Sequence, residues 1–270
     1  MKLRIVSYNT HGLPWSNQKP HEISDWCLQQ DPDVVCLQEV FLQQMQDLYS
    51  SLFSRAGFIV IVPRDKGFSF FPSGLLCLVK TTRFQVLSHR FEPFLSHDFV
   101  EIGANKGFQR LVLQSKVTGR LVSLINTHMQ STTVMTVFES KAGIQRILRE
   151  QFDQMVNAFP APCEYSVKTP TFVVGDFNCE ASPHTDVRFF YPAAPLRKST
   201  FPETGEDLDH IAWMPLQWTL PGQPWCSMDV TGPKILSYTV TPLPYSDHYP
   251  ILVDLWIASF PAQKAKGCSV

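Results

Sequence analysis

The sequence has 270 residues, of which 44% are apolar and 17% charged, with a formal net charge of −1 and a pI near 6.7. These values are typical of a globular chain with one large domain or two small ones. They exclude a strong long-range field for nucleic acid, although a local basic patch stays compatible with them. No apolar run approaches the ~20 residues that a membrane-spanning helix requires, and MKLRIVSYNTHG lacks the apolar stretch of a secretory signal.

Ten short runs of β-branched and other apolar residues predict strands. In chain order they cover residues 3–8, 33–40, 58–62, 74–79, 110–117, 120–127, 171–177, 208–213, 234–240 and 250–257. The sequence KVTGR at 116–120 is typical of a hairpin turn, so the two strands that flank it are predicted to pair antiparallel.

Three segments have apolar residues at helical spacing instead. The first surrounds Ile23 and Cys27, the second runs from Phe41 to Phe53 and closes at Gly57, and the third runs from Ile144 and ends before Pro160. Many strands covered by a few helices predict a layered α/β or α+β fold. We expect one domain over residues 1–258, followed by a flexible polar tail over 259–270.

Seven cysteines are scattered along the chain and none forms a CxxC pair. Cys36 and Cys77 stand in apolar runs, where a small buried thiol is the simplest interpretation. The pattern indicates a reduced, cytoplasmic protein. Cys268 stands one place short of a prenylation box; palmitoylation is conceivable there, but a frayed tail is the preferred interpretation.

Polar residues with catalytic potential stand at the ends of six of these predicted strands. Any one of them is explained by ordinary turn chemistry, but strand ends on one edge of a sheet converge on a common cleft. The six positions are Asn9, Gln38-Glu39, Asn126 with His128, Asp176 with Asn178, Asp209-His210 and Ser246-Asp247-His248.

The residue types favour metal-assisted hydrolysis of a phosphate ester. Glu39 and Asn9 offer hard oxygen ligands without the Cys or His spacing of a zinc site, which favours Mg²⁺. His128 and Asn178 can donate hydrogen bonds to an oxyanion. The sequence has no GxSxG elbow for a nucleophilic serine, so water is the expected nucleophile.

The proton-transfer groups are not fixed by residue type alone. Asp176 or His248 can take a proton from water, and Asp209 or Asp247 can orient the histidine.

The ordered set SYNTHG, LQEV, INTHMQ, GDFN, LDHI and SDHYP resembles the endonuclease/exonuclease/phosphatase superfamily, which has the fold of deoxyribonuclease I. The resemblance covers residues 3 to about 257. It implies a four-layer α/β/β/α sandwich in which two mixed β-sheets pack face to face with helices outside. It also implies a Mg²⁺ cofactor, with Mn²⁺ as a substitute, and a monomer.

The resemblance also assigns roles to residues. It implies that Glu39 is the principal metal ligand, with Asn9 beside it and Asp247 near the metal. His128 and Asn178 are expected to bind phosphate. The remaining roles are Asp176 as the group that aligns the attacking water, His248 as general base or acid, and Asp209 as its orienting carboxylate. His11 is a departure, because abasic-site endonucleases usually carry a carboxylate there.

Further segments favour one branch. PSGLLCLVK, NKGF and THMQ resemble elements of sphingomyelinases, whereas VVGDFNCEASP lacks the pattern of inositol polyphosphate 5-phosphatases. In GANKGFQR, Gly103 and Gly107 are expected to form a tight turn, and Lys106 to reach the substrate phosphate or a buried carboxylate.

The resemblance therefore implies that the chain cleaves sphingomyelin to ceramide and phosphocholine, as a peripheral enzyme that meets a lipid head group at a membrane surface. The alternatives are a nuclease or nucleic-acid-end-processing phosphodiesterase, an inositol-phosphate phosphatase and a catalytically silent binding module. Trp213, Trp218 and Trp225 in the 213–225 loop either meet the bilayer or pack against the protein.

Overall fold

The structure is a computed structural model that describes residues 1–13, 15–63, 71–132, 140–158, 169–180, 192, 198–214 and 233–258. These residues form two β-sheets, three α-helices and one 3₁₀ helix. The predictions for the tail 259–270, including Cys268, and for Trp218 and Trp225 lie outside the described residues.

The first sheet has six strands in the order β10-β11-β1-β2-β4-β3. β1 and β2 are parallel, and the other neighbours pair antiparallel. The sheet is therefore mixed. Its strands are β1 (Lys2–Asn9), β2 (Val34–Gln38), β3 (Phe58–Ile61), β4 (Leu76–Lys80), β10 (Lys234–Val240) and β11 (Ile251–Trp256).

The second sheet has five strands in the order β5-β6-β7-β8-β9, with β7 and β8 as its parallel pair. β6 and β7 pair antiparallel across the 116–120 turn, which confirms the predicted hairpin. The strands are β5 (Phe84–Pro93), β6 (Gly107–Ser115), β7 (Leu121–His128), β8 (Thr171–Asp176) and β9 (Asp209–Met214).

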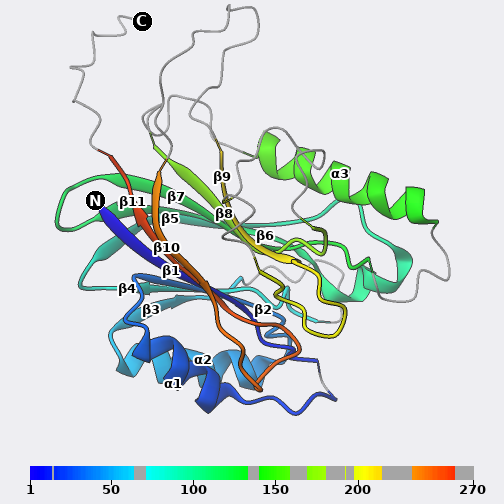
Figure 1. Cartoon of the computed structure of the whole chain (residues 1–270), viewed down its shortest axis with the longest axis horizontal. Helices are drawn as coiled ribbons and strands as arrows, with labels where there is room; N and C mark the ends of the chain where they lie inside the picture. The colour runs from blue at the N-terminus through cyan, green and yellow to red at the C-terminus, as the bar shows by residue number, and fades with distance from the viewer. Residues whose placement is uncertain are drawn as a thin grey trace, which may run out of the picture.

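The two sheets pack face to face, and their outer faces are covered by helices (Figure 1). Side chains from both sheets form one apolar core between them. Separate apolar clusters join the outer face of the first sheet to α1 and α2, and the outer face of the second to α3. The four-layer sandwich is thus confirmed. The helices are α1 (Pro20–Gln29), α2 (Gln43–Arg55) and α3 (Lys141–Asn157).

Burial on both faces explains why the central strands are rich in apolar residues. In β1, Leu3 and Ile5 enter the core between the sheets, whereas Val6 and Tyr8 face α1 and α2. Successive side chains of a strand point to opposite faces. A strand between two apolar layers therefore carries apolar residues on both of its faces.

β5 is a strand that the sequence prediction missed. It is an edge strand, and most of its side chains are exposed or half-buried. A register shift between Val86 and Ser88 also interrupts its alternation. Only the beginning of β5, at Phe84 and Val86, packs against the core, so the described strand carries no sustained period-2 pattern.

The turn before β6 differs from the prediction for Gly107. Gly107 lies within β6, and a Cβ there would meet the Glu92 carbonyl oxygen at 2.3 Å. Gly107 is thus required by the close approach of β5 and not by a turn. The positive φ of the turn, 46°, belongs to Asn105, a residue type that tolerates this conformation.

Candidate active site

The carboxyl ends of both parallel strand pairs lie at one edge of the sandwich. Asn9 ends β1 and Glu39 follows β2, while His128 ends β7 and Asp176 ends β8. β9 runs antiparallel to β8, so its first residue, Asp209, is the register partner of Asp176. The structure thereby brings together side chains that are up to 200 positions apart in the sequence.

Glu39 projects toward the second sheet from a strained position. Its backbone is left-handed, with φ of 61°, which is uncommon for a non-glycine residue. The loop that follows β1 approaches the Glu39 backbone closely, because a Cβ on Gly12 would lie 1.9 Å from the Glu39 carbonyl oxygen. Its carboxylate Oε1 accepts a hydrogen bond from Asn9 Nδ2 at 3.1 Å. Burial raises the pKa of Glu39 despite that hydrogen bond.

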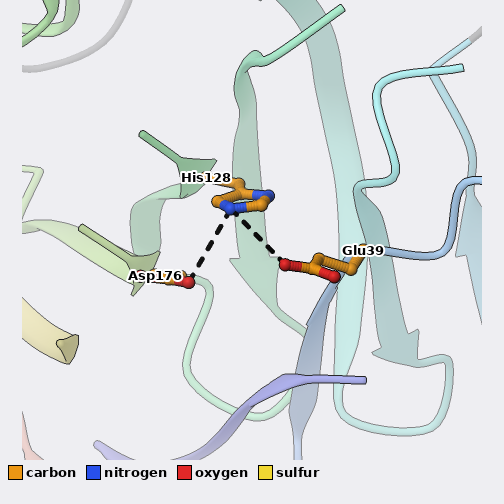
Figure 2. A group of neighbouring side chains, drawn as sticks. All are labelled: Glu39, His128 and Asp176. Atoms are coloured by element: carbon orange, nitrogen blue, oxygen red, sulfur yellow. Dashed lines mark ion pairs between the residues drawn. The ribbon is translucent and has the colours of Figure 1, made fainter. Parts of the chain in front are cut away.

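His128 faces two carboxylates. Its Nε2 lies 3.8 Å from Glu39 Oε1 and 3.7 Å from Asp176 Oδ2, so the imidazole points between the two acids (Figure 2). Burial, helped by the positive charge of Lys106, lowers the pKa of His128 well below its usual value. The ring is therefore neutral at physiological pH, and it can donate one hydrogen bond without adding charge.

Asp176 and Asn178 form the turn that ends β8. The Asp176 Oδ1 atom accepts a hydrogen bond from the Asn178 backbone N–H at 2.8 Å, and its Oδ2 accepts one from Asn9 Nδ2 at 2.9 Å. Asn178 adopts a positive φ of 51° and donates from Nδ2 to the Met129 carbonyl at 3.1 Å. Burial, followed by the neighbouring Asp209 carboxylate, raises the pKa of Asp176 to about 7.

His248 is held by Asp209. Its Nδ1 lies 2.6 Å from Asp209 Oδ2, and its Nε2 lies 3.8 Å from Asp176 Oδ2. Burial by itself lowers the pKa of His248, but the Asp209 and Asp176 carboxylates outweigh it and the pKa rises to about 10. The imidazole therefore carries a proton at neutral pH, with Nε2 directed toward Asp176. Of the two carboxylates that the sequence left as orienting groups, the structure pairs Asp209 with His248.

Asp247 instead pairs with His11. The His11 Nδ1 atom hydrogen-bonds to Asp247 Oδ2, and this bond raises the pKa of His11. Ser246 Oγ donates to the Asn9 carbonyl at 2.7 Å and to Asp247 Oδ1 at 3.2 Å, which fixes this loop against β1. The imidazole of His11, at the position where abasic-site endonucleases usually carry a carboxylate, thus binds the Asp247 carboxylate.

Lys106 reaches a buried carboxylate, one of the two outcomes expected from sequence. Its Nζ lies 2.8 Å from Glu101 Oε1 and 2.9 Å from the Met129 carbonyl oxygen, and both side chains are almost fully buried. The Met129 carbonyl also accepts from Asn178. Lys106 therefore contacts the site through a shared carbonyl, while its ammonium is already neutralised by Glu101.

Two residues of this region carried no sequence signal. Phe201 places its ring 4.9 Å from the His248 ring, and Glu101 pairs with Lys106 from the 3₁₀ helix Phe99–Ala104. Phe201 lies outside the named strands and helices and Glu101 lies in a short 3₁₀ helix, so neither periodicity nor strand-end position could identify them. Trp213, which the sequence assigned either to a membrane surface or to packing, lies in β9 and packs against the core between the sheets.

The residues fit a divalent metal ion. Within the described part of the chain, two groups have ligand atoms within 4.8 Å of one another: Glu39, His128 and Asp176 form the first, and Asp176, Asp209 and His248 form the second. Glu39 Oε2 and Asp209 Oδ1 are buried yet have no hydrogen-bond partner among the described residues. A buried carboxylate oxygen without a donor is costly, and a hard cation satisfies it.

Asn9 and Asp247 belong to neither of these two groups of candidate metal ligands. The Asn9 amide donates to both Glu39 and Asp176, while its Oδ1 accepts from the His11 N–H at 3.0 Å. Metal ligation by Asn9 and Asp247 therefore stays a prediction.

Comparison of the sequence with known families identifies the class of protein to which this fold and candidate site belong. Residues 6–248 match the model of the Endonuclease/Exonuclease/phosphatase family, to which the chain belongs. This family comprises divalent-metal-dependent hydrolases that act on phosphoester bonds. A search among curated protein sequences gives no match. No helix in the described part of the chain is long and apolar enough to cross a membrane.

Several solved structures share the fold. Sphingomyelinase C from Streptomyces griseocarneus matches with a TM-score of 0.67 and 19% identity, covering 94% of this chain and 99% of that one. Beta toxin from Staphylococcus aureus, a mutant with bound magnesium ions, matches with 0.66 and 17%, covering 94% and 99%. D. rerio TDP2 complexed with single-strand DNA product matches with 0.66 and 14%, covering 94% and 98%.

The raised pKa of Asp176 predicts that metal binding depends on pH. At pH 6 this carboxyl is mostly protonated and at pH 8 mostly ionised, because its pKa is about 7. A metal ion must displace that proton. The half-saturating Mg²⁺ concentration, measured by calorimetry, should fall about tenfold from pH 6 to pH 8. A Mg²⁺ affinity that is constant from pH 6 to pH 8 would contradict the role of Asp176 as a metal ligand.

The buried Lys106–Glu101 pair predicts a large stability effect. Lys106→Met leaves Glu101 buried without its cation and should lower the free energy of unfolding by about 3–5 kcal/mol. The double variant Glu101→Gln/Lys106→Met should recover most of that loss. Urea denaturation measures both, with Lys80→Met as control, because its partner Asp31 is exposed and such pairs contribute at most ~1 kcal/mol. Equal losses in Lys106→Met and Lys80→Met would refute the prediction.

Proposed function

We propose that the chain is an Mg²⁺-dependent phosphodiesterase that hydrolyses sphingomyelin to ceramide and phosphocholine. The observation that carries the hydrolytic part is the cluster of Glu39, Asp176, His128, Asp209 and His248 at one sheet edge, with two buried carboxylate oxygens free to take a cation. The sphingomyelin part is supported by the SGLL, NKGF and THMQ segments.

In this proposal Glu39 and Asp176 hold the metal, with Asn9 and Asp247 completing its surroundings. When bound, the ion supplies positive charge that offsets the charge developing on the phosphate. Mn²⁺, which also accepts oxygen ligands, is expected to substitute.

The side chains of the site then bind the phosphate group and transfer protons. The neutral His128 and the amide of Asn178 donate hydrogen bonds to a phosphate oxygen. Asp176 orients the attacking water and accepts a proton from it, as the water oxygen bonds to phosphorus and the bond between phosphorus and the ceramide oxygen breaks. His248 is protonated before reaction, so the metal-free geometry favours it as the general acid that protonates the departing ceramide oxygen, with Asp209 fixing its ring.

A nucleic-acid phosphodiesterase is the second candidate. The similarity to TDP2 complexed with single-strand DNA product is as close in TM-score as the similarity to the beta toxin with magnesium ions. The net charge of −1 counts against this candidate, because strong phosphate contacts along a strand need clustered Lys and Arg. An inositol-phosphate phosphatase and a silent binding module have no specific observation in their favour.

Sphingomyelin liposomes test the proposal directly. With millimolar Mg²⁺ the wild-type chain should release phosphocholine, and Glu39→Ala should not, because it removes the principal metal ligand. Plasmid, abasic and single-stranded oligonucleotides are assayed in parallel. Cleavage of an oligonucleotide with no phosphocholine release would replace the lipid substrate by nucleic acid, and no cleavage of either would refute a phosphodiesterase.

His248→Ala should lower kcat by about 10²–10⁴-fold because it removes the proton donor for the leaving group. His89→Ala is the matched control, since His89 is exposed on β5, and its activity should equal that of the wild type. Thermal unfolding of both variants shows whether the fold is kept. A folded His248→Ala enzyme with full turnover would overturn the assignment.

A further inference from the structure

Two buried amide side chains connect the sheets directly behind the candidate active site. Gln38 is the last residue of β2 in the six-stranded sheet, and Asn126 lies in β7 of the five-stranded sheet. Gln38 Nε2 donates to Asn126 Oδ1 at 2.7 Å, and neither side chain is exposed. The bond therefore crosses the interface between the two sheets, whose facing side chains are mainly apolar.

Asn126 also binds the backbone at the point where β2 and β4 separate. Its Nδ2 donates to the carbonyls of Leu37 and Leu76, each at 3.1 Å. These two residues are register partners at the end of the β2–β4 ladder. One side chain of the second sheet thus fixes the end of the strand from which Glu39 projects.

The positions of the two amides tie them to the two halves of the site. Glu39 directly follows Gln38 and leaves the strand with a positive φ. His128 lies two residues after Asn126, so the two side chains share one face of β7. Any shift of one sheet against the other would change the 3.8 Å separation between Glu39 and His128.

The arrangement is not the one expected from stability alone. Gln38 Oε1 is buried and has no hydrogen-bond partner among the described residues, which is destabilising relative to an apolar side chain of the same shape. Gln38 Nε2 has only longer contacts beyond Asn126, at 3.3 Å to Ser7 Oγ and to the Cys36 carbonyl. What the amide adds is a directional bond to Asn126.

We propose that Gln38 and Asn126 are positioning residues whose hydrogen bond between the sheets sets Glu39 against His128 and Asp176 for metal binding. The inference rests on the proposed metal-dependent function and deepens it. Its primary readout, the binding of Mn²⁺, needs no substrate.

Gln109 provides a matched control. It is the register partner of Asn126 on β6, it is equally buried, and its Nε2 donates to the Ile61 carbonyl of β3 at 2.9 Å. This bond also joins the two sheets, but it holds an edge strand that carries no residue of the candidate site. Gln109→Met therefore removes a similar interaction without touching β2.

The test compares Mn²⁺ binding, by electron paramagnetic resonance, in the wild type, Gln38→Met/Asn126→Leu, Gln38→Asn and Gln109→Met. Removing both amides avoids leaving one of them unpaired, and Gln38→Asn keeps the polarity but withdraws the donor by one methylene. The dissociation constant for Mn²⁺ should rise about 10–100-fold in Gln38→Met/Asn126→Leu and in Gln38→Asn. It should stay near the wild-type value in Gln109→Met. At saturating metal, kcat should fall while KM changes little.

The measured Mn²⁺ affinities test the positioning role and the metal site separately. Wild-type Mn²⁺ affinity in either folded Gln38 variant, or an equal loss of affinity in Gln109→Met, would overturn the positioning role and leave the proposed function standing. Absence of Mn²⁺ binding in the wild type would overturn the metal site itself. If the double variant does not fold, the Mn²⁺ affinity of Gln38→Asn alone tests the positioning role: a reduced affinity supports it and a wild-type affinity overturns it.

Discussion

The contact between the two β-sheets is the constraint on which the candidate site depends. Glu39 and Asn9 come from the parallel pair of one sheet, and His128 and Asp176 come from the parallel pair of the other. The apolar core between the sheets supplies the driving force for their contact. Apolar packing is non-directional, however, and the placement of opposing side chains to within a few ångströms needs directional contacts such as the amide bonds across the interface.

Burial gives this site an electrostatic character that its residue types alone would not have. Asp176 and Asp209 lie side by side and are almost fully buried. Burial and the neighbouring Asp209 raise the pKa of Asp176, whereas burial lowers the pKa of His248 and the two carboxylates outweigh that effect. A low-dielectric site disfavours neighbouring negative charges, so it favours any cation that enters. The same burial keeps His128 neutral. One imidazole of the site is thus charged, because His248 contacts Asp209 at 2.6 Å, and the other is neutral, because His128 is buried near Lys106.

Much of the fold and site was predictable because both rest on local patterns. Strands buried on two faces are rich in apolar residues, so β1, β2 and β8 were predicted, and each has at its carboxyl end a polar residue that reaches the site. The exposed edge strand β5 had no such pattern. The contact of the Phe201 ring with His248 and the pairing of His11 with Asp247 join segments that are far apart in the sequence. The carboxylate that pairs with Lys106, Glu101, lies in a short 3₁₀ helix that the sequence did not predict. No periodicity encodes those contacts.

The buried carboxylates at this sheet edge are proposed to hold a divalent cation. Anomalous diffraction from a crystal soaked in Mn²⁺ would locate such an ion. We expect a Mn²⁺ peak within about 2.5 Å of Glu39 Oε2, which has no hydrogen-bond partner among the described residues. A well-ordered site without such a peak, with Glu39 Oε2 hydrogen-bonded to protein, would contradict it.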